Sequence, residues 1–174
     1  MTSMVVMDAG RFLISTDRSR IDLDVIHRFL TRSYWAAGIP RETIARSIDN
    51  SLCFGVYDGR NQIGFARVIS DFATFAYVAD VYIDEHYRER GLGKELMASI
   101  MAHPDLQGLR RWNLATRDAH GLYAQAGYAP LAHPDTWMER RPVKGYVEGV
   151  PGPLATPTPG GPPTAPPESE RPPR

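Results

Sequence analysis

The sequence predicts a single α/β domain, an α+β arrangement with a mixed, mostly antiparallel sheet of six to seven strands and about four helices. One observation is a change of period. Residues 78–83 are rich in β-branched and aromatic side chains, as in a buried strand, and from Leu92 onward the apolar residues recur on one helical face. A second observation is a hairpin pattern, in which the apolar runs 51–57 and 62–69 flank the turn 58–61.

The remaining elements follow from the same two periods. Strands are expected where apolar and β-branched residues cluster, at 11–16, 75–83, 111–116, 128–131 and 136–140. Helices are expected where apolar residues recur every three or four positions, at 22–34, 41–49, 92–103 and 119–126. Pro40 precedes the second helix, Pro104 ends the third, and Asp118 and Gly127 bound the fourth. The predicted order is β-α-α-β-β-β-α-β-α-β-β.

Composition sets the limits of the domain and of its partners. Ten of the 15 prolines lie between positions 151 and 173, so we expect residues 1–145 to fold and residues 146–174 to form a disordered, proline-rich tail. Lys and Arg total 20, as do Asp and Glu, and this balance gives no support for binding to nucleic acid or a membrane. No signal peptide or membrane-length apolar run is present, and the single cysteine suits the cytoplasm.

The turn at 88–93, RERGLG, carries the first chemical signal. A turn there would leave backbone N–H groups unpaired at a helix N-terminus, beside arginines, and this arrangement favours an anion. Gly91 and Gly93 would let a phosphate approach the backbone. The dinucleotide fingerprint fails because Leu96 replaces its third glycine, and the P-loop fails because Arg88 replaces its first.

Arg88-x-x-Gly91-x-Gly93 after a strand resembles the acyl-CoA-binding motif of the GCN5-related N-acetyltransferases, the GNAT superfamily. The stretch 122–128, LYAQAGY, is similar to the other signature of the family, L-Y-x-x-x-G-[F/Y] on the last helix. The two motifs stand in the family's order, and the predicted elements follow the family's fold. The resemblance implies an enzyme that transfers an acetyl group from acetyl-CoA to a primary amine by direct attack in a ternary complex.

In this family the turn holds the pyrophosphate of the cofactor, and the pantetheine arm pairs with the preceding strand. The resemblance therefore assigns cofactor binding to Val81, Tyr82, Ile83, Arg88, Glu89, Arg90, Gly91, Leu92, Gly93 and Lys94. A bulge near Asp80 is needed to free the strand edge, and a freed N–H near Tyr82 or Ile83 is expected to stabilise the oxyanion. Thr116 stands where many members carry an asparagine that holds the pantetheine arm.

Two side chains are candidates for proton transfer. Tyr123 matches the family tyrosine that protonates the departing CoA thiolate, and a phenol is neutral at pH 7; the alternative is a packed core tyrosine. Asp80 lies within an apolar run, so it is either the base that takes the amine proton or a structural aspartate bonded to donors that the bulge frees. His120 and a water molecule are the other candidate bases.

The acceptor pocket of this fold lies by the first two helices. That implies Tyr34, Trp35 and Ile39, together with Asp71 and Phe72 from a loop between strands. Aromatic walls suit an amine, and an aspartate would hold its ammonium; the alternative for Tyr34 and Trp35 is core packing at the end of a helix. We expect a small-molecule amine as acceptor in preference to a peptide amine, and a monomer or homodimer. No His or Cys spacing supports a metal site. The alternative function is a non-catalytic acyl-CoA-binding sensor or partner module.

Overall fold

The computed structural model describes residues 5–9, 11–140 and 146, which form one six-stranded sheet and four α-helices. The strands, which follow one another across the sheet in chain order, are β1 (Val5–Ala9), β2 (Phe12–Ser15), β3 (Leu52–Asp58), β4 (Asn61–Ser70), β5 (Phe75–Ile83) and β6 (Arg111–Asn113). The helices are α1 (Leu23–Leu30), α2 (Arg41–Asp49), α3 (Leu92–Met101) and α4 (His120–Gln125). Among the described strands, β5 and β6 alone pair in parallel, which confirms the predicted fold class.

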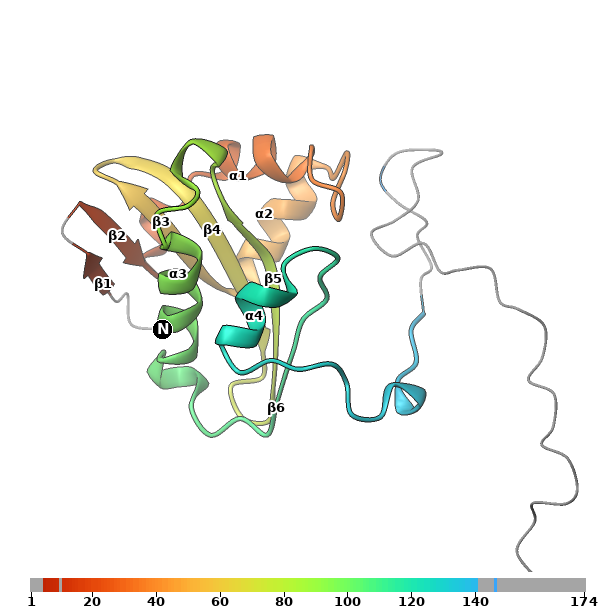
Figure 1. Ribbon diagram of the computed structural model, residues 1–174. Coiled ribbons are helices and arrows are strands. Elements are labelled where there is room, and N and C mark those ends of the chain that lie inside the picture. The colour runs from red at the N-terminus through yellow and green to blue at the C-terminus, as the bar shows by residue number, and fades with distance from the viewer. Residues whose placement is uncertain (1–4, 10, 141–145, 147–174) are drawn as a thin grey trace, which may run out of the picture.

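The helices cover the sheet from both faces, with α1 and α2 on one face and α3 and α4 on the other (Figure 1). On the α3–α4 face, Leu96 and Ile100 belong to the same buried cluster as Phe54 of β3. On the α1–α2 face, Ile26 packs in a second cluster with Phe65 of β4. Apolar burial on both faces holds β4 and β5 between the two layers of helices.

Three expectations about the elements are wrong. The closing strands at 128–131 and 136–140 do not form, and the part of 128–140 that has regular structure is a 3-10 turn at Pro134–Thr136. Pro130 lacks the N–H that a strand ladder requires, and the 3-10 turn that begins at Pro134 takes up the first residue of the second predicted strand, Thr136. The strand predicted at 111–116 is β6, and it ends at Asn113 instead of Thr116. The first helix ends at Leu30, whose carbonyl accepts a bond from the Ser33 hydroxyl at 2.7 Å, so a side chain competes with the next helical turn.

β1 is an additional strand that the sequence patterns did not predict. Apart from residue 146, the predicted tail 146–174 lies outside the described residues. Within the described ranges, no helix is both long enough and apolar enough to cross a membrane.

Candidate active site

The site begins where β5 loses a neighbour. β6 pairs with β5 only at Phe75, Ala76 and Tyr77, and the chain after Asn113 then leaves the sheet. β5 continues to Ile83 with β4 as its single strand neighbour among the described residues. One edge of β5 from residue 78 to residue 83 is therefore open.

A bulge interrupts the pairing of β5 with β4 on the opposite edge. The register passes from Tyr82 opposite Phe65 to Ala79 opposite Arg67, so two residues of β5, Asp80 and Val81, face one residue of β4. Asp80 takes a left-handed backbone conformation, with φ of 54°. The bulge expected near Asp80 is confirmed.

The ladder determines which N–H groups reach the open edge. The Asp84 N–H donates to the Ile63 carbonyl at 2.7 Å, beside the pair formed by Ile83 and Gly64. Neighbouring residues of a strand alternate in direction, so the Ile83 and Val81 N–H groups point away from β4 and the Tyr82 N–H points toward it. Of the two expected oxyanion donors, Ile83 fits this geometry and Tyr82 does not.

A pocket of about 900 Å³ lies against the open edge. Its lining residues come from β5, the connection after α1, the turn after β5 and the start of α4. The lining residues that the sequence predicted are Tyr34, Trp35, Val81, Tyr82, Ile83, Arg88, Glu89, Leu92, Gly93 and Tyr123. The lining residues that it missed are Phe29, Arg32, Ser33, Asp84, Glu85, Tyr87, Arg117, Asp118, Ala119 and Leu122.

The turn at 88–93 presents unpaired donors beside this pocket. Gly91 is the N-cap of α3 with φ of 80°, a conformation that a glycine adopts without strain. In the described part of the chain, the N–H groups of residues 89–93 have no hydrogen-bond acceptor. Gly93 faces α4, where an added Cβ would lie 3.6 Å from the Leu122 side chain. Arg90, Gly91 and Lys94 belong to the turn and the first helical turn but do not line the pocket.

Tyr123 lies on the α4 side of the pocket and is 9% exposed. Its ring meets that of Tyr128 edge-on, with 6.1 Å between the centroids. Burial raises the pKa of Tyr123 to about 12. The phenol therefore keeps its proton at neutral pH and can donate it.

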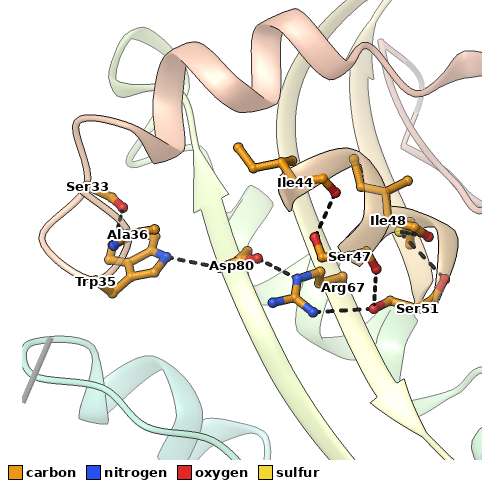
Figure 2. Close-up of polar contacts among 10 residues, drawn as sticks. Ser33, Trp35, Ala36, Ile44, Ser47, Ile48, Ser51, Arg67 and Asp80 are labelled. Carbon is orange, nitrogen blue, oxygen red and sulfur yellow. Dashed lines mark hydrogen bonds and ion pairs between the residues drawn. The ribbon is translucent and has the colours of Figure 1, made fainter. Parts of the chain in front are cut away.

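Asp80 is held by two side chains (Figure 2). Its Oδ2 accepts from Arg67 Nε at 2.5 Å, and its Oδ1 accepts from Trp35 Nε1 at 3.2 Å. Asp80 does not line the pocket, and both of its oxygens already accept a bond, which disfavours the role of base. The structural role fits, although its donors are side chains rather than the expected backbone groups. His120 is exposed and does not line the pocket either.

The structure places Thr116 and Asp118 differently from what the sequence predicted. The Ala119 N–H at the start of α4 donates to Thr116 Oγ1 at 3.1 Å, and Asp118 makes no capping bond. Asp118 instead lines the pocket, whereas Thr116 does not. The Thr116 hydroxyl is therefore already engaged by the turn that precedes α4, and its contact with the pantetheine arm stays a prediction.

Asp71 and Phe72 were expected in the acceptor pocket and do not line it. They form the turn that precedes β5, where Asp71 accepts bonds from three successive N–H groups, those of residues 73–75. At a rise of about 3.3 Å per residue, β5 separates this turn from Ile83 by roughly 26 Å. The loop was assigned to the wrong end of the strand.

Two arginines that the sequence reading missed connect the parts of the site. The Arg117 N–H donates to the Tyr34 hydroxyl at 3.1 Å, and its guanidinium lies 3.8 Å from the centre of that ring. Arg67 binds Asp80 from the adjacent strand. The sequence held a signal for the ion pair of Arg67 with Asp80. Each of two neighbouring apolar strands contains one charged residue in its interior, and the two charges are opposite.

Comparisons with known proteins agree with this geometry. The family described as acetyltransferase (GNAT) domain matches residues 49–130. A curated Gibberella zeae protein, provisionally named an acetyltransferase, is 30% identical over 139 residues, which are 67% of this chain and 77% of that protein. A crystal structure of a GNAT-family protein from Xanthomonas campestris pv. campestris is 51% identical, with a TM-score of 0.74 over 77% of this chain and 95% of that one.

A more distant structure shares the fold. It is a Clostridium acetobutylicum protein, provisionally named an acetyltransferase and solved with acetyl-CoA, 14% identical, with a TM-score of 0.55 over 68% of this chain and 87% of that one. The family match, the identities and the open β5 edge beside the glycine turn all agree. The chain belongs to the GNAT family of acetyltransferases.

Proposed function

We propose that this protein transfers the acetyl group of acetyl-CoA to the primary amine of a small-molecule acceptor. The observation that carries the proposal is the open edge of β5, which runs directly into the unpaired donors of the turn at 88–93. An extended pantetheine arm would pair with the outward N–H and C=O groups of Ile83, and the pyrophosphate would bind the turn. The acetyl-CoA bound by the Clostridium neighbour, which shares the fold, agrees with this choice of co-substrate.

The direction of the arm sets where the thioester would lie. With the pyrophosphate at the turn, the arm runs back along β5 and brings the thioester toward the bulge. The outward N–H of Val81 is then the donor nearest to the carbonyl oxygen. A donor in this position stabilises the oxyanion, and its loss typically slows such reactions by about 10²–10³-fold.

The reaction requires two proton transfers. The neutral amine attacks the carbonyl carbon to form a tetrahedral intermediate, the C–S bond then breaks, and the CoA thiolate takes a proton from Tyr123. The attacking nitrogen gives up one proton, and Tyr123 recovers one, so the products are an amide and free CoA thiol. We assign removal of the amine proton to water, because Asp80 and His120 do not line the pocket.

The acceptor would enter from the side of the α1–α2 connection. Tyr34 and Trp35 form an aromatic wall there, with ring centroids 4.9 Å apart in an edge-to-face arrangement. Such a wall suits the apolar body of a small amine. We further propose a cytoplasmic protein, a monomer or homodimer that uses acetyl-CoA as its co-substrate without a metal.

The test is a calorimetric titration of acetyl-CoA into the wild type and into the double variant Arg88→Ala, Gly91→Glu. We expect micromolar binding that the double variant loses, while Arg60→Ala, an exposed residue of the β3–β4 turn, retains it. A panel of primary amines is then screened for release of free thiol. Binding without thiol release would favour the non-catalytic sensor, and no binding by the folded wild type would overturn both functions.

A further inference from the structure

We propose that Arg67, Asp80 and Trp35 form a positioning network that aims the Val81 N–H at the thioester and fixes the acceptor wall at the same time. The inference rests on the proposed acetyl transfer. None of the three side chains is assigned a chemical step. Their effect passes through the backbone of the bulge and through the indole ring of Trp35.

The bulge needs a restraint. Asp80 holds a left-handed conformation that residues other than glycine adopt at a cost, so its backbone would relax without a compensating contact. Arg67 supplies that contact from β4, where it pairs with Ala79, the residue immediately before Asp80. The ion pair thus spans the bulge from the neighbouring strand, and Val81 follows directly after the restrained residue.

The same carboxylate holds the acceptor wall. Trp35 donates its indole N–H to Asp80 and lines the pocket, so the carboxylate joins the wall to the reacting edge. The chain segment 33–36, which contains Trp35, is also held by an internal hydrogen bond, because the Ala36 N–H donates to Ser33 Oγ at 3.2 Å (Figure 2). A rotation of Trp35 would therefore break its contact with the bulge.

The network is anchored to the rest of the fold through Arg67. Arg67 Nη1 donates to Ser51 Oγ at 3.3 Å, and that hydroxyl donates to the Ser47 carbonyl of α2 at 2.7 Å. The side chains of Arg67 and Asp80 are only 18% and 11% exposed, so water screens their attraction weakly. Removing either one would leave its partner as an uncompensated, largely buried charge.

Another arginine–aspartate ion pair, that of Arg11 with Asp58, provides a control for the loss of the Arg67–Asp80 pair. Arg11 binds Asp58 of β3 at 2.5 Å, with the Arg11 side chain 65% exposed. Neither residue lines the pocket. Arg11→Met removes an arginine–aspartate ion pair that is bidentate and more exposed, and it leaves the bulge and the wall untouched.

The experiment compares Arg67→Met, Arg67→Lys, Asp80→Gly and the control Arg11→Met with the wild type. The readouts are the Kd of acetyl-CoA, the ¹³C shift of the carbonyl of bound [1-¹³C]acetyl-CoA, and kcat and KM with the best amine of the panel. In the wild type we expect a downfield carbonyl shift, because the Val81 N–H polarises the bond.

In Arg67→Met we expect that shift to be lost and kcat to fall by about 10–100-fold, within the range for a misplaced reacting group, while the Kd stays within about threefold. The Kd is spared because the turn at 88–93 is outside the network. Arg67→Lys keeps the charge and should recover part of kcat. Asp80→Gly tolerates the left-handed backbone but lacks both contacts, so it should resemble Arg67→Met.

A wild-type carbonyl shift and kcat in folded Arg67→Met would overturn the inference, as would wild-type behaviour of Asp80→Gly. Equal loss of Kd and kcat would also overturn it, since that pattern indicates a general structural defect. If Arg67→Met does not fold, Arg67→Lys and Asp80→Gly decide by the same criteria. Absence of acetyl-CoA binding in the wild type would overturn the proposed function and this inference with it, whereas binding with an unshifted carbonyl overturns the inference alone.

Discussion

The two ends of β5 differ in how many strands they touch. At its start, Phe75 to Tyr77 are flanked by β4 and β6, and Asp71 closes the preceding turn with three N–H bonds. At its end, residues 81–83 have β4 as their single neighbour among the described strands, and Ile83 lines the pocket. One strand therefore stabilises the domain at one end and offers a binding edge at the other.

The difference teaches where chemistry can be placed in a sheet. A backbone donor that is already paired in a ladder cannot bind a ligand, and an unpaired donor must find water or a partner. The open end of β5 meets a pocket and a turn rich in donors, so its unpaired groups can be satisfied by a ligand. Variants at the two ends should therefore separate activity from stability.

The largest effect is expected from Tyr123→Phe at the open end. Loss of the acid should lower the rate of thiol release by about 10²-fold or more, while the Kd of acetyl-CoA remains nearly unchanged. Because burial raises the pKa of Tyr123 to about 12, its deprotonation should not limit the rate of the wild type below about pH 10. Thiol release as a function of pH measures both effects.

Tyr128→Phe is the matched control for that variant. Tyr128 packs edge-on against Tyr123, and its buried hydroxyl has no hydrogen-bond partner in the described structure. Removing this hydroxyl should leave activity unchanged, because it leaves no donor or acceptor unpaired. A parallel loss of activity in both variants would assign Tyr123 to packing alone.

The next largest effect is expected at Gly64 of β4, which pairs with Ile83 at the end of β5. A Cβ on Gly64 would lie 2.7 Å from Ile83 Cδ1 and 2.9 Å from the Tyr82 carbonyl oxygen. Gly64→Ala should therefore force β4 and β5 apart and lower the free energy of unfolding by about 1–3 kcal/mol, as overpacking typically does. Urea denaturation measures this change.

Gly121→Ala provides the comparison, because a Cβ there meets nothing within 4 Å. This variant should be neutral or slightly stabilising, since alanine favours a helix more than glycine does. Equal stability of the two variants would mean that the β4–β5 pairing at Ile83 is more adaptable than its geometry indicates.

The sequence predicted the components of the site better than their grouping. The turn at 88–93 and Tyr123 were found because their residue types form local patterns that the fold preserves. Asp71 was misplaced because an exposed aspartate in a loop looks the same at either end of a strand; only the order of the sheet shows which end meets the pocket. Arg67 was missed because its role depends on register, and a bulge shifts register in a way that strand periodicity does not show.

The smallest effect on activity is expected from Asp71→Ala at the fully paired end. The hydroxyl of Thr74 and the N–H groups of residues 73–75 hold the pKa of Asp71 well below its usual range. A carboxyl whose pKa is lowered by folding stabilises the protein above its ordinary pKa of about 3.9, and this contribution is lost as the pH falls through the lower, folded value. Asp71→Ala should thus lower the midpoint of thermal unfolding at neutral pH, and the two midpoints should converge in acid.

The rate of thiol release by Asp71→Ala at neutral pH should stay within about twofold of the wild type, because surface changes away from a site rarely affect it. Asp71→Asn keeps the oxygen that accepts the N–H bonds of the turn, so its midpoint of thermal unfolding should stay close to that of the wild type. A large loss of activity in Asp71→Ala at an unchanged midpoint would mean that the start of β5 takes part in acceptor binding after all. That result would join the two ends of β5 functionally, and an acceptor long enough to span the strand would be required.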